Sequence, residues 1–116
     1  MNFEKMSENE ILAIATPIMD NLMEASTKID HEAHIRDFTD RMKKIVTKEY
    51  LQKVCLQYQK EKGFFSERKP VAVFKRPDSA AIIWKQSFTK AKGEFVAEMV
   101  LVNQNGRFLC DHAMVF

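Results

Sequence analysis

The sequence has few of the residues that mark unusual folds, with three glycines, three prolines and two cysteines in 116 residues. So few cysteines exclude a disulfide-stapled scaffold, and so little glycine and proline excludes a collagen-like repeat or a low-complexity chain. Charge of one sign is lacking too, because 18 Lys and Arg stand against 16 Asp and Glu. A net charge of +2 predicts no nucleic-acid partner.

Long apolar runs are also absent. No stretch approaches the roughly 18 apolar residues of a membrane span, and the opening MNFEKMSENE lacks the apolar run of a secretory signal. We therefore expect a cytoplasmic protein without a membrane partner, in which Cys55 and Cys110 are reduced, buried thiols. A chain of this length is expected to fold as one domain over residues 1–116.

Glycine and aromatic residues are distributed unevenly along this chain. Residues 1–62 contain no glycine and only four of the twelve aromatic residues. Their apolar residues recur at spacings of three and four, which predicts helices over about residues 8–62. Gly63 is expected to end this helical part, because glycine adopts the left-handed conformation that often follows a helix.

Several residues mark where these helices begin. Ser7 with Glu10 is a capping-box pattern ahead of an apolar run. Pro17 interrupts that run, so either the helix kinks there or a short first turn ends and the main helix starts at the proline. Asp30 and Thr47 are typical first residues of two further helices.

From Pro70 onward the apolar period changes to two, and β-branched and aromatic residues dominate. This pattern predicts an antiparallel sheet over about residues 70–116. The expected strands are Val71–Arg76, Ala80–Thr89, Glu94–Asn103 and Arg107–Val115. Asn105-Gly106 predicts a type I′ hairpin, because that turn needs positive φ at both central residues.

The hairpin also predicts the register of the last two strands. With the turn at Asn105-Gly106, three pairs face each other: Met99 with His112, Leu101 with Cys110, and Val100 with Asp111. A four-residue loop over residues 90–93 would give two further pairs, Trp84 with Met99 and Lys85 with Glu98.

This register divides the sheet into two faces of different polarity. The bulky, nearly uncharged face is expected to lie under the helices and carries Ile82, Trp84, Gln86, Phe88, Phe95, Ala97, Met99, Leu101, Phe108, Cys110, His112, Met114 and Phe116. The other carries Ile83, Lys85, Ser87, Val96, Glu98, Val100, Val102, Leu109, Asp111, Ala113 and Val115. Its band of aliphatic side chains is more apolar than a solvated face, so we expect a homodimer packed through it.

Helices followed by an antiparallel meander form an α+β roll. This order, the ending GEFVAEMVLVNQNGRFLCDHAMVF and the Asn105-Gly106 turn resemble the nuclear transport factor 2-like superfamily, also called cystatin-like or SnoaL-like. The resemblance implies N-terminal helices packed in the concave side of a curved sheet, which together form a cone. It also implies frequent dimers through the sheet. Members of the superfamily include isomerases, dehydratases, polyketide cyclases and transport adaptors.

The pair Asp111-His112 is the strongest candidate for chemistry. Adjacent strand residues point to opposite faces, so His112 is expected to point inward, near Met99 and Trp84. A histidine in an apolar wall can act as a general acid or base, and the alternative is a structural histidine. The expected pocket residues are Tyr58, Trp84, Gln86, Met99, Cys110 and His112, with Asp37 a further candidate from the helices. No inward strand carboxylate is evident, which counts against an isomerase-like base.

His31 and His34 lie in the run D-H-E-A-H, three residues apart. The metalloprotease motif needs its histidines four apart, so a solvated helix start capped by Asp30 is the better interpretation. We expect no metal site. The chain also contains no Gly-rich phosphate loop and no nucleophile elbow, and we expect no cofactor.

Three functions remain open at this point. The chain could be a small dimeric protein that binds a small apolar ligand or a protein partner, without catalysis. It could be an enzyme of the isomerase, dehydratase or cyclase kind that uses His112 in a cone-shaped pocket. It could also be an assembly unit without a pocket. A cavity of a few hundred Å³ with His112 in its wall would favour the first two functions, whereas a filled core would favour the third.

Overall fold

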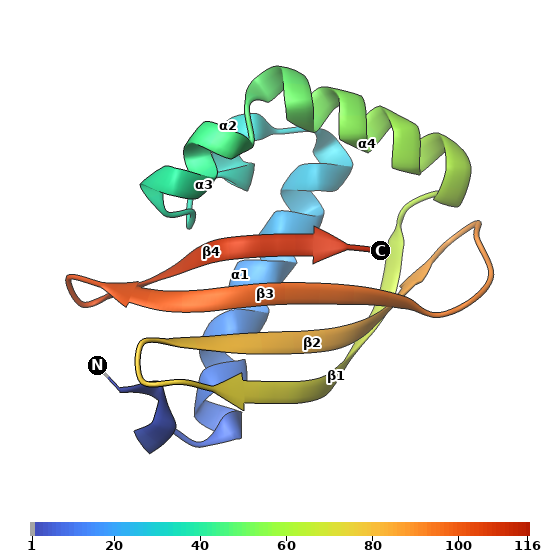
Figure 1. Ribbon diagram of the computed structural model, residues 1–116. Coiled ribbons are helices and arrows are strands. Elements are labelled where there is room, and N and C mark those ends of the chain that lie inside the picture. The colour runs from blue at the N-terminus through green and yellow to red at the C-terminus, as the bar shows by residue number, and fades with distance from the viewer. Residues whose placement is uncertain (1) are drawn as a thin grey trace.

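A long helix crosses one face of a four-stranded sheet in the computed structural model, which describes residues 2–116 (Figure 1). The helical part comprises a short 3-10 helix η1 (Phe3–Lys5), α1 (Glu8–Lys28), α2 (His31–His34), α3 (Asp40–Ile45) and α4 (Lys48–Lys62). The antiparallel sheet has the order β1 (Phe65–Lys75), β2 (Ser79–Phe88), β3 (Phe95–Gln104) and β4 (Arg107–Val115). The expected α+β architecture is confirmed.

The start of α1 is capped as the sequence predicts. Ser7 Oγ accepts a hydrogen bond from the Glu10 amide at 3.1 Å, and the Ser7 amide donates to Glu10 Oε1 at 3.0 Å. The helix then runs unbroken through Pro17, so a new helix start at Pro17 is wrong. Pro17 is exposed, and its missing amide costs the helix one hydrogen bond on the solvent side only.

The segment after Asp30 folds into two short helices. Asp30 caps α2, but this helix ends at His34, and Thr39 Oγ1 accepts from the Met42 amide at 3.3 Å to begin α3. Between the two helices residues 35–37 form a turn, and Phe38 then forms a parallel bridge with Cys110 of β4. Residues 37–39 therefore cover one end of the outer edge of β4.

The first strand begins earlier than expected, at Phe65 rather than Val71. It contains Pro70, which lies beside an irregularity in the pairing between Pro70 and Ala72. Because β1 is an edge strand, it tolerates a residue that cannot donate a backbone hydrogen bond. Proline therefore does not mark the start of the sheet in this chain.

The hairpin turn between β3 and β4 has the expected conformation, with φ of 56° at Asn105 and 84° at Gly106. The register between β2 and β3 is different from the prediction. Trp84 lies opposite Ala97 rather than Met99, because the last pair of the two strands is Gln86 with Phe95 and the connection is not centred on residues 90–93. The displacement is two residues, so each side chain keeps its predicted face.

The predicted pairing of Lys85 with Glu98 on the outer face is wrong for the same reason. Lys85 lies opposite Val96, and its ammonium forms an ion pair with Glu94 instead. Both partners are largely exposed, so this ion pair contributes little to stability.

A one-residue bulge interrupts the pairing of β3 with β4 at Asp111. Leu101 lies opposite Cys110, as the hairpin predicts. One residue further on, Val100 lies opposite His112 rather than Asp111, so the predicted Val100–Asp111 pair is wrong. Two residues of β4 thus oppose one residue of β3, which is the arrangement of a β-bulge.

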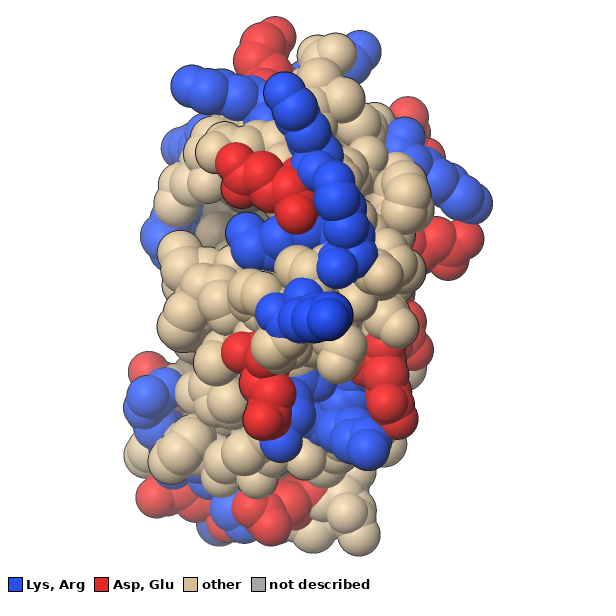
Figure 2. Space-filling model, turned by 90° about the vertical axis from the view of Figure 1, so that its right-hand side faces the viewer, with Lys and Arg blue, Asp and Glu red and all other residues tan. Residues whose placement is uncertain are grey.

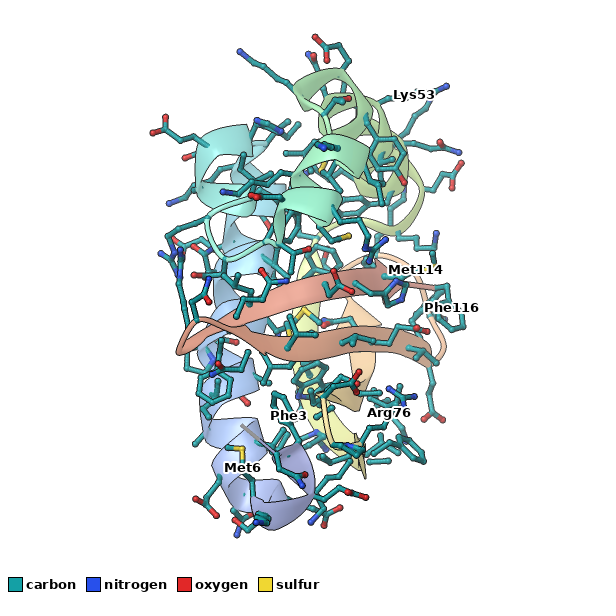
Figure 3. All side chains as sticks on the ribbon, turned by 60° about the vertical axis from the view of Figure 1, so that its left-hand side comes forward. Phe3, Met6, Lys53, Arg76, Met114 and Phe116 are labelled. Atoms are coloured by element: carbon teal, nitrogen blue, oxygen red, sulfur yellow. The ribbon has the colours of Figure 1, made fainter. Side chains whose placement is uncertain are left out.

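The bulge reverses the side-chain alternation over the rest of β4. Ala113 lies opposite Met99 and packs against the core, so the predicted pairing of Met99 with His112 is wrong. His112, Met114 and Phe116 lie instead on the outer face, because a one-residue shift moves every following side chain to the other side of a strand. Figure 3 shows Met114 and Phe116 on the side of the sheet opposite α1.

The core lies between α1 and the inner face of the sheet. Its largest fully buried side chains are Trp84, Phe3, Ile11, Met19, Ile82, Met99, Leu101, Gln86, Thr39, Cys55 and Cys110. Gln86 is polar, and its Nε2 donates to the backbone oxygen of Ser87 at 2.9 Å and of Ser66 at 3.2 Å. Over residues 2–116, none of the helices combines the length and the apolar character that a membrane crossing requires.

Candidate functional site

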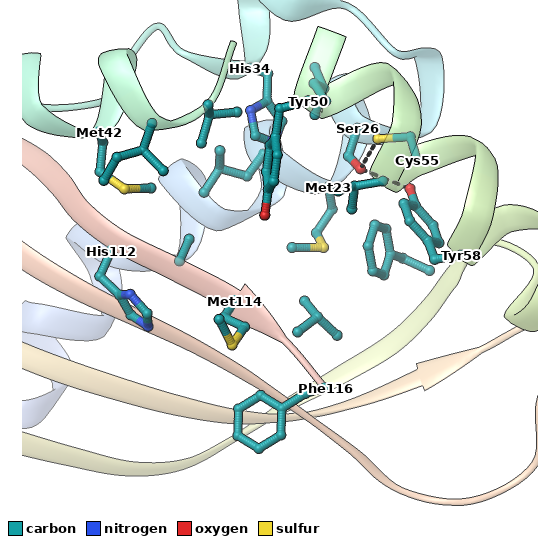
Figure 4. A pocket seen from close by; sticks show the side chains of 18 of the residues that line it. Met23, Ser26, His34, Met42, Tyr50, Cys55, Tyr58, His112, Met114 and Phe116 are labelled. Carbon is teal, nitrogen blue, oxygen red and sulfur yellow. Dashed lines mark hydrogen bonds between the residues drawn. The ribbon is translucent and has the colours of Figure 1, made fainter. Parts of the chain in front are cut away.

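A groove of about 480 Å³ lies between the helices and the end of β4 (Figure 4). Its apolar wall includes Leu22, Met23, Met42, Leu51, Val54, Phe65, Phe88, Phe95 and Val115. Pockets for small molecules range from about 300 to 1,000 Å³ and are mostly apolar. Side chains therefore fill the space between α1 and the sheet, whereas the space under α4 is a groove.

The face of α4 that covers this groove has a simple spacing. Tyr50, Val54 and Tyr58 follow one another at intervals of four residues, which places them on one side of a helix. In Figure 4 the Tyr50 side chain hangs from α4 with its hydroxyl toward the open space. Thr47 Oγ1, which accepts from the Tyr50 amide at 3.1 Å, begins the helix and so sets this orientation.

Large apolar side chains with high exposure gather around the groove. Those that line it are Ile45 (50% exposed), Tyr50 (51%), Val54 (39%), Met114 (52%) and Phe116 (58%). Exposed apolar side chains that gather in this way are uncommon on a monomeric protein.

A polar cluster lies in the wall between α1 and α4. Ser26 Oγ is 2.8 Å from the Tyr58 hydroxyl and 3.2 Å from Cys55 Sγ. Burial raises the pKa of Tyr58 and of Cys55, so both groups keep their protons at neutral pH. The cluster can therefore donate or accept hydrogen bonds but supplies no nucleophilic thiolate.

His34 also lines the groove, at the end of α2. Its ring packs edge-on against Phe38 with 5.3 Å between the ring centroids, and its Nδ1 is buried without a hydrogen-bond partner among the described residues. Burial, together with the nearby His31, lowers the pKa of His34 to about 4. The expected solvated position is wrong for His34, which is neutral at physiological pH.

The other residues of the D-H-E-A-H run have structural roles. Asp30 Oδ1 accepts from the Ala33 amide at 3.2 Å, which confirms it as a helix cap. His31 Nε2 donates to the backbone oxygen of Val46 at 2.8 Å. Over residues 2–116, no three His, Cys, Asp or Glu side chains lie close enough together to hold a metal ion.

His112 lies at the mouth of the groove rather than inside the core. Its Nε2 donates to Glu98 Oε2 at 2.8 Å on the outer face, and its side chain is 36% exposed. The inward position beside Met99 and Trp84 is wrong, because the bulge at Asp111 turns His112 outward. The structure thus joins His112 to an outer-face carboxylate.

The six residues expected to line a pocket separate into two groups. Tyr58 and His112 line the groove. The other four belong to the buried core and do not line it: Trp84, Gln86, Met99 and Cys110. Burial raises the pKa of the Cys110 thiol to about 12, and its Sγ donates to the backbone oxygen of His112 at 3.3 Å. Asp37 points elsewhere and forms ion pairs with Arg36 and Arg107.

Charge at the groove has one sign. The charged side chains that line it are Arg41 and Lys62, and no Asp or Glu of residues 2–116 does so. Arg41 is bonded to Asp111, whereas Lys62 lies with its Nζ 5.9 Å from the ring centroid of Phe95. Figure 2 shows several Lys and Arg side chains, with Asp and Glu among them, on the upper half of the face that contains the end of α4. Within the groove an anionic group would be favoured beside Lys62.

Neither a protein-family description nor a curated protein matches this sequence. Several solved structures have a similar fold. A designed NTF2-like protein superposes with a TM-score of 0.64 and 12% identity over 95% of this chain and 100% of its own. An NTF2-like protein of unknown function from Methylobacillus flagellatus gives 0.61 and 11% identity, over 99% of this chain and 97% of its own.

A SEC-C motif containing protein from Rhodopseudomonas palustris has a TM-score of 0.57 and 11% identity, over 89% of each chain. Identities this low establish architecture alone, because one fold hosts many functions. The superposition covers nearly all of this chain and of the two NTF2-like proteins, so the arrangement of helices over an antiparallel sheet is shared. The chain has an NTF2-like fold.

Proposed function

We propose that this protein binds a ligand that places an apolar group in the groove under α4. The observation that carries the proposal is an unfilled volume of about 480 Å³ with exposed apolar side chains around it. Burying such side chains against a ligand contributes about 25 cal/mol per Å² of apolar surface removed from water.

The chemistry of the walls supports binding over acid–base catalysis. His34 is neutral at physiological pH, and Tyr58 keeps its proton. The alternative function, proton transfer by His112, would require substrate at the mouth of the groove, where His112 is bonded to Glu98. The Ser26–Tyr58 hydroxyls suit a ligand with one hydrogen-bonding group on an otherwise apolar body.

The proposal can be tested with 8-anilinonaphthalene-1-sulfonate, an apolar anionic dye that fluoresces when it leaves water. Val54→Trp should fill the groove and reduce dye binding at least tenfold. Leu56→Trp is the matched control, because Leu56 lies on the same helix, is 55% exposed and does not line the groove. Equal dye binding by both variants would contradict the proposal.

We also propose that the outer face of the sheet packs against a second copy of the chain. The bulge adds Met114 and Phe116 to the aliphatic band of β2 and β3, and Phe74 of β1 is 54% exposed. Sedimentation at high micromolar concentration should give a dimer. Phe74→Glu should shift it to monomer, whereas Phe64→Glu, at a comparably exposed residue outside the sheet, should not. A wild-type monomer would overturn this proposal.

A further inference from the structure

The part of β4 that borders the groove has backbone groups without a hydrogen-bond partner among residues 2–116. Val96 and Phe116 exchange two backbone hydrogen bonds, at 2.6 and 2.9 Å. In an antiparallel pair, residues that bond to the neighbouring strand alternate with residues whose amide and carbonyl point the other way. Ala113 and Val115 are therefore the residues whose backbone groups face the open edge of the sheet, and both line the groove.

The preceding part of the same edge is already paired by the chain itself. The Cys110 amide donates to the backbone oxygen of Asp37 at 2.7 Å, and the Thr39 amide donates to the backbone oxygen of Cys110 at 3.1 Å. Residues 37–39 thus act as a very short fifth strand. At Asp40 the chain turns into α3, and the edge beyond the bulge is left to the groove.

We propose that an extended peptide with apolar side chains adds to this free edge as a continuation of the fifth strand, within the groove. The inference rests on the proposed function, because it assigns an occupant to the same site. A hydrocarbon ligand would bury the free amides and carbonyls of Ala113 and Val115 without partners, which is costly. A peptide in the β conformation satisfies these groups and places alternate side chains in apolar pockets.

The surroundings of the edge favour one strand over a second copy of the whole sheet. Residues of α3 and α4 line the groove opposite β4, so the edge is roofed by helices (Figure 4). A single added strand needs about 4.8 Å of space beside β4. A whole second sheet would clash with α3 and α4. Because Lys62 lines the groove and forms no ion pair among the described residues, whereas Arg41 is paired with Asp111, an acidic residue at the end of the peptide near Lys62 would be favoured.

The probe is the peptide acetyl-Glu-Val-Thr-Phe-Thr-Val-Glu-amide, titrated into the full chain and followed by NMR. Binding should slow hydrogen exchange of the Ala113 and Val115 amides. Ala113→Pro removes one of these donors at an edge position that tolerates proline, and should weaken binding about tenfold or more. Ala113→Ser keeps the amide and should lose much less affinity than Ala113→Pro.

A second measurement covers the case in which Ala113→Pro does not fold. Two versions of the peptide, N-methylated at the Val and Phe residues or at the Thr residues, should differ about tenfold or more in affinity for the wild type, because only one set of amides faces β4. Equal affinities overturn the inference. The inference also fails if the peptide does not bind while the dye binds the wild type and not Val54→Trp. In that case the proposed function stands. If neither dye nor peptide binds, both proposals fail.

Discussion

Thr39 donates a hydrogen bond from its Oγ1 to Oδ1 of Asp111 at 2.7 Å, across 72 residues of sequence. The same Thr39 oxygen accepts from the Met42 amide and so begins α3. Asp111 in turn accepts from Arg41 Nε at 3.2 Å, and it is the bulged residue of β4. One carboxylate therefore connects the position of α3 to the bulge that shapes the groove.

We expect Asp111→Ala to lower the free energy of unfolding by about 1 to 3 kcal/mol, because it leaves the buried Thr39 hydroxyl and one arm of Arg41 without their partner. Urea denaturation of Asp111→Ala, Thr39→Val and the double variant measures the coupling between the two residues. A double variant whose loss equals the sum of the single losses would show that the contact contributes no coupling.

The same carboxylate predicts a dependence on pH. Burial raises the pKa of Asp111, but hydrogen bonds from Thr39 and Arg41 outweigh it, and the pKa lies below the ordinary 3.8. A group with a lowered pKa stabilises the fold above its unfolded value and loses that contribution as pH falls through the folded one. The difference in stability between wild type and Asp111→Asn should be constant at neutral pH and should shrink below about pH 3.8.

His34 predicts a second pH dependence, in a different range. Its pKa is 6.5 when unfolded and about 4 in the fold, because burial and His31 disfavour the charged ring. The unfolded chain therefore binds more protons between these values, and stability falls as pH decreases from 6.5 toward 4. The loss between pH 7 and pH 4 is about 2 to 3 kcal/mol.

His34→Leu removes this titration and keeps an apolar side chain against Phe38. The free energy of unfolding of wild type minus that of His34→Leu should decrease by the stated amount between pH 7 and pH 4. Chemical denaturation at a series of pH values measures the difference. A difference that stays constant over that range would show that the His34 ring is solvated.

Two glycines with positive φ differ in what a side chain would meet there. Gly63 and Gly106 have φ of 85° and 84°, so alanine is strained at both positions, and the ψ of −146° at Gly63 lies near a region that only glycine adopts readily. A Cβ at Gly63 would also collide with Thr89 Oγ1, which is held by the Phe64 amide at 2.9 Å, whereas a Cβ at Gly106 meets open space.

We expect Gly106→Ala to lower the unfolding free energy by about 1 kcal/mol and Gly63→Ala by about 1 to 3 kcal/mol more. Thermal and urea denaturation of the two variants provide the comparison. If both lose the same amount, neither the ψ of Gly63 nor its close contact with Thr89 adds to the cost of the substitution.

Features that depend on nearby residues could be predicted from the sequence. Ser7 with Glu10 and the Asn105-Gly106 turn are complete within a few residues, and the structure confirms both. The change of apolar period at the middle of the chain likewise separates helices from sheet. These signals determine the fold class because each one is set by local backbone geometry.

The site could be predicted only in part, because the one-residue bulge at Asp111 reverses the side-chain alternation of β4. The bulge at Asp111 is stabilised by Thr39 and Arg41, which lie about 70 residues away and carry no local signal. Without the bulge, alternation places His112 inside, and with it His112 faces Glu98. The Tyr50–Tyr58 face of α4 did have a signal, the spacing of four residues, but nothing in the sequence shows that the space beneath it is open.

The Ser26 cluster provides the last prediction, because its two hydrogen bonds meet at one oxygen. Ser26→Ala removes the partner of both Tyr58 and Cys55, whereas Tyr58→Phe leaves Ser26 bonded to Cys55. We therefore expect the loss of unfolding free energy to be about 1 to 2 kcal/mol for Ser26→Ala and smaller for Tyr58→Phe. Urea denaturation of both variants at neutral pH measures the order. A larger loss for Tyr58→Phe would show that the aromatic packing against Phe65 depends on the hydroxyl more than the cluster does.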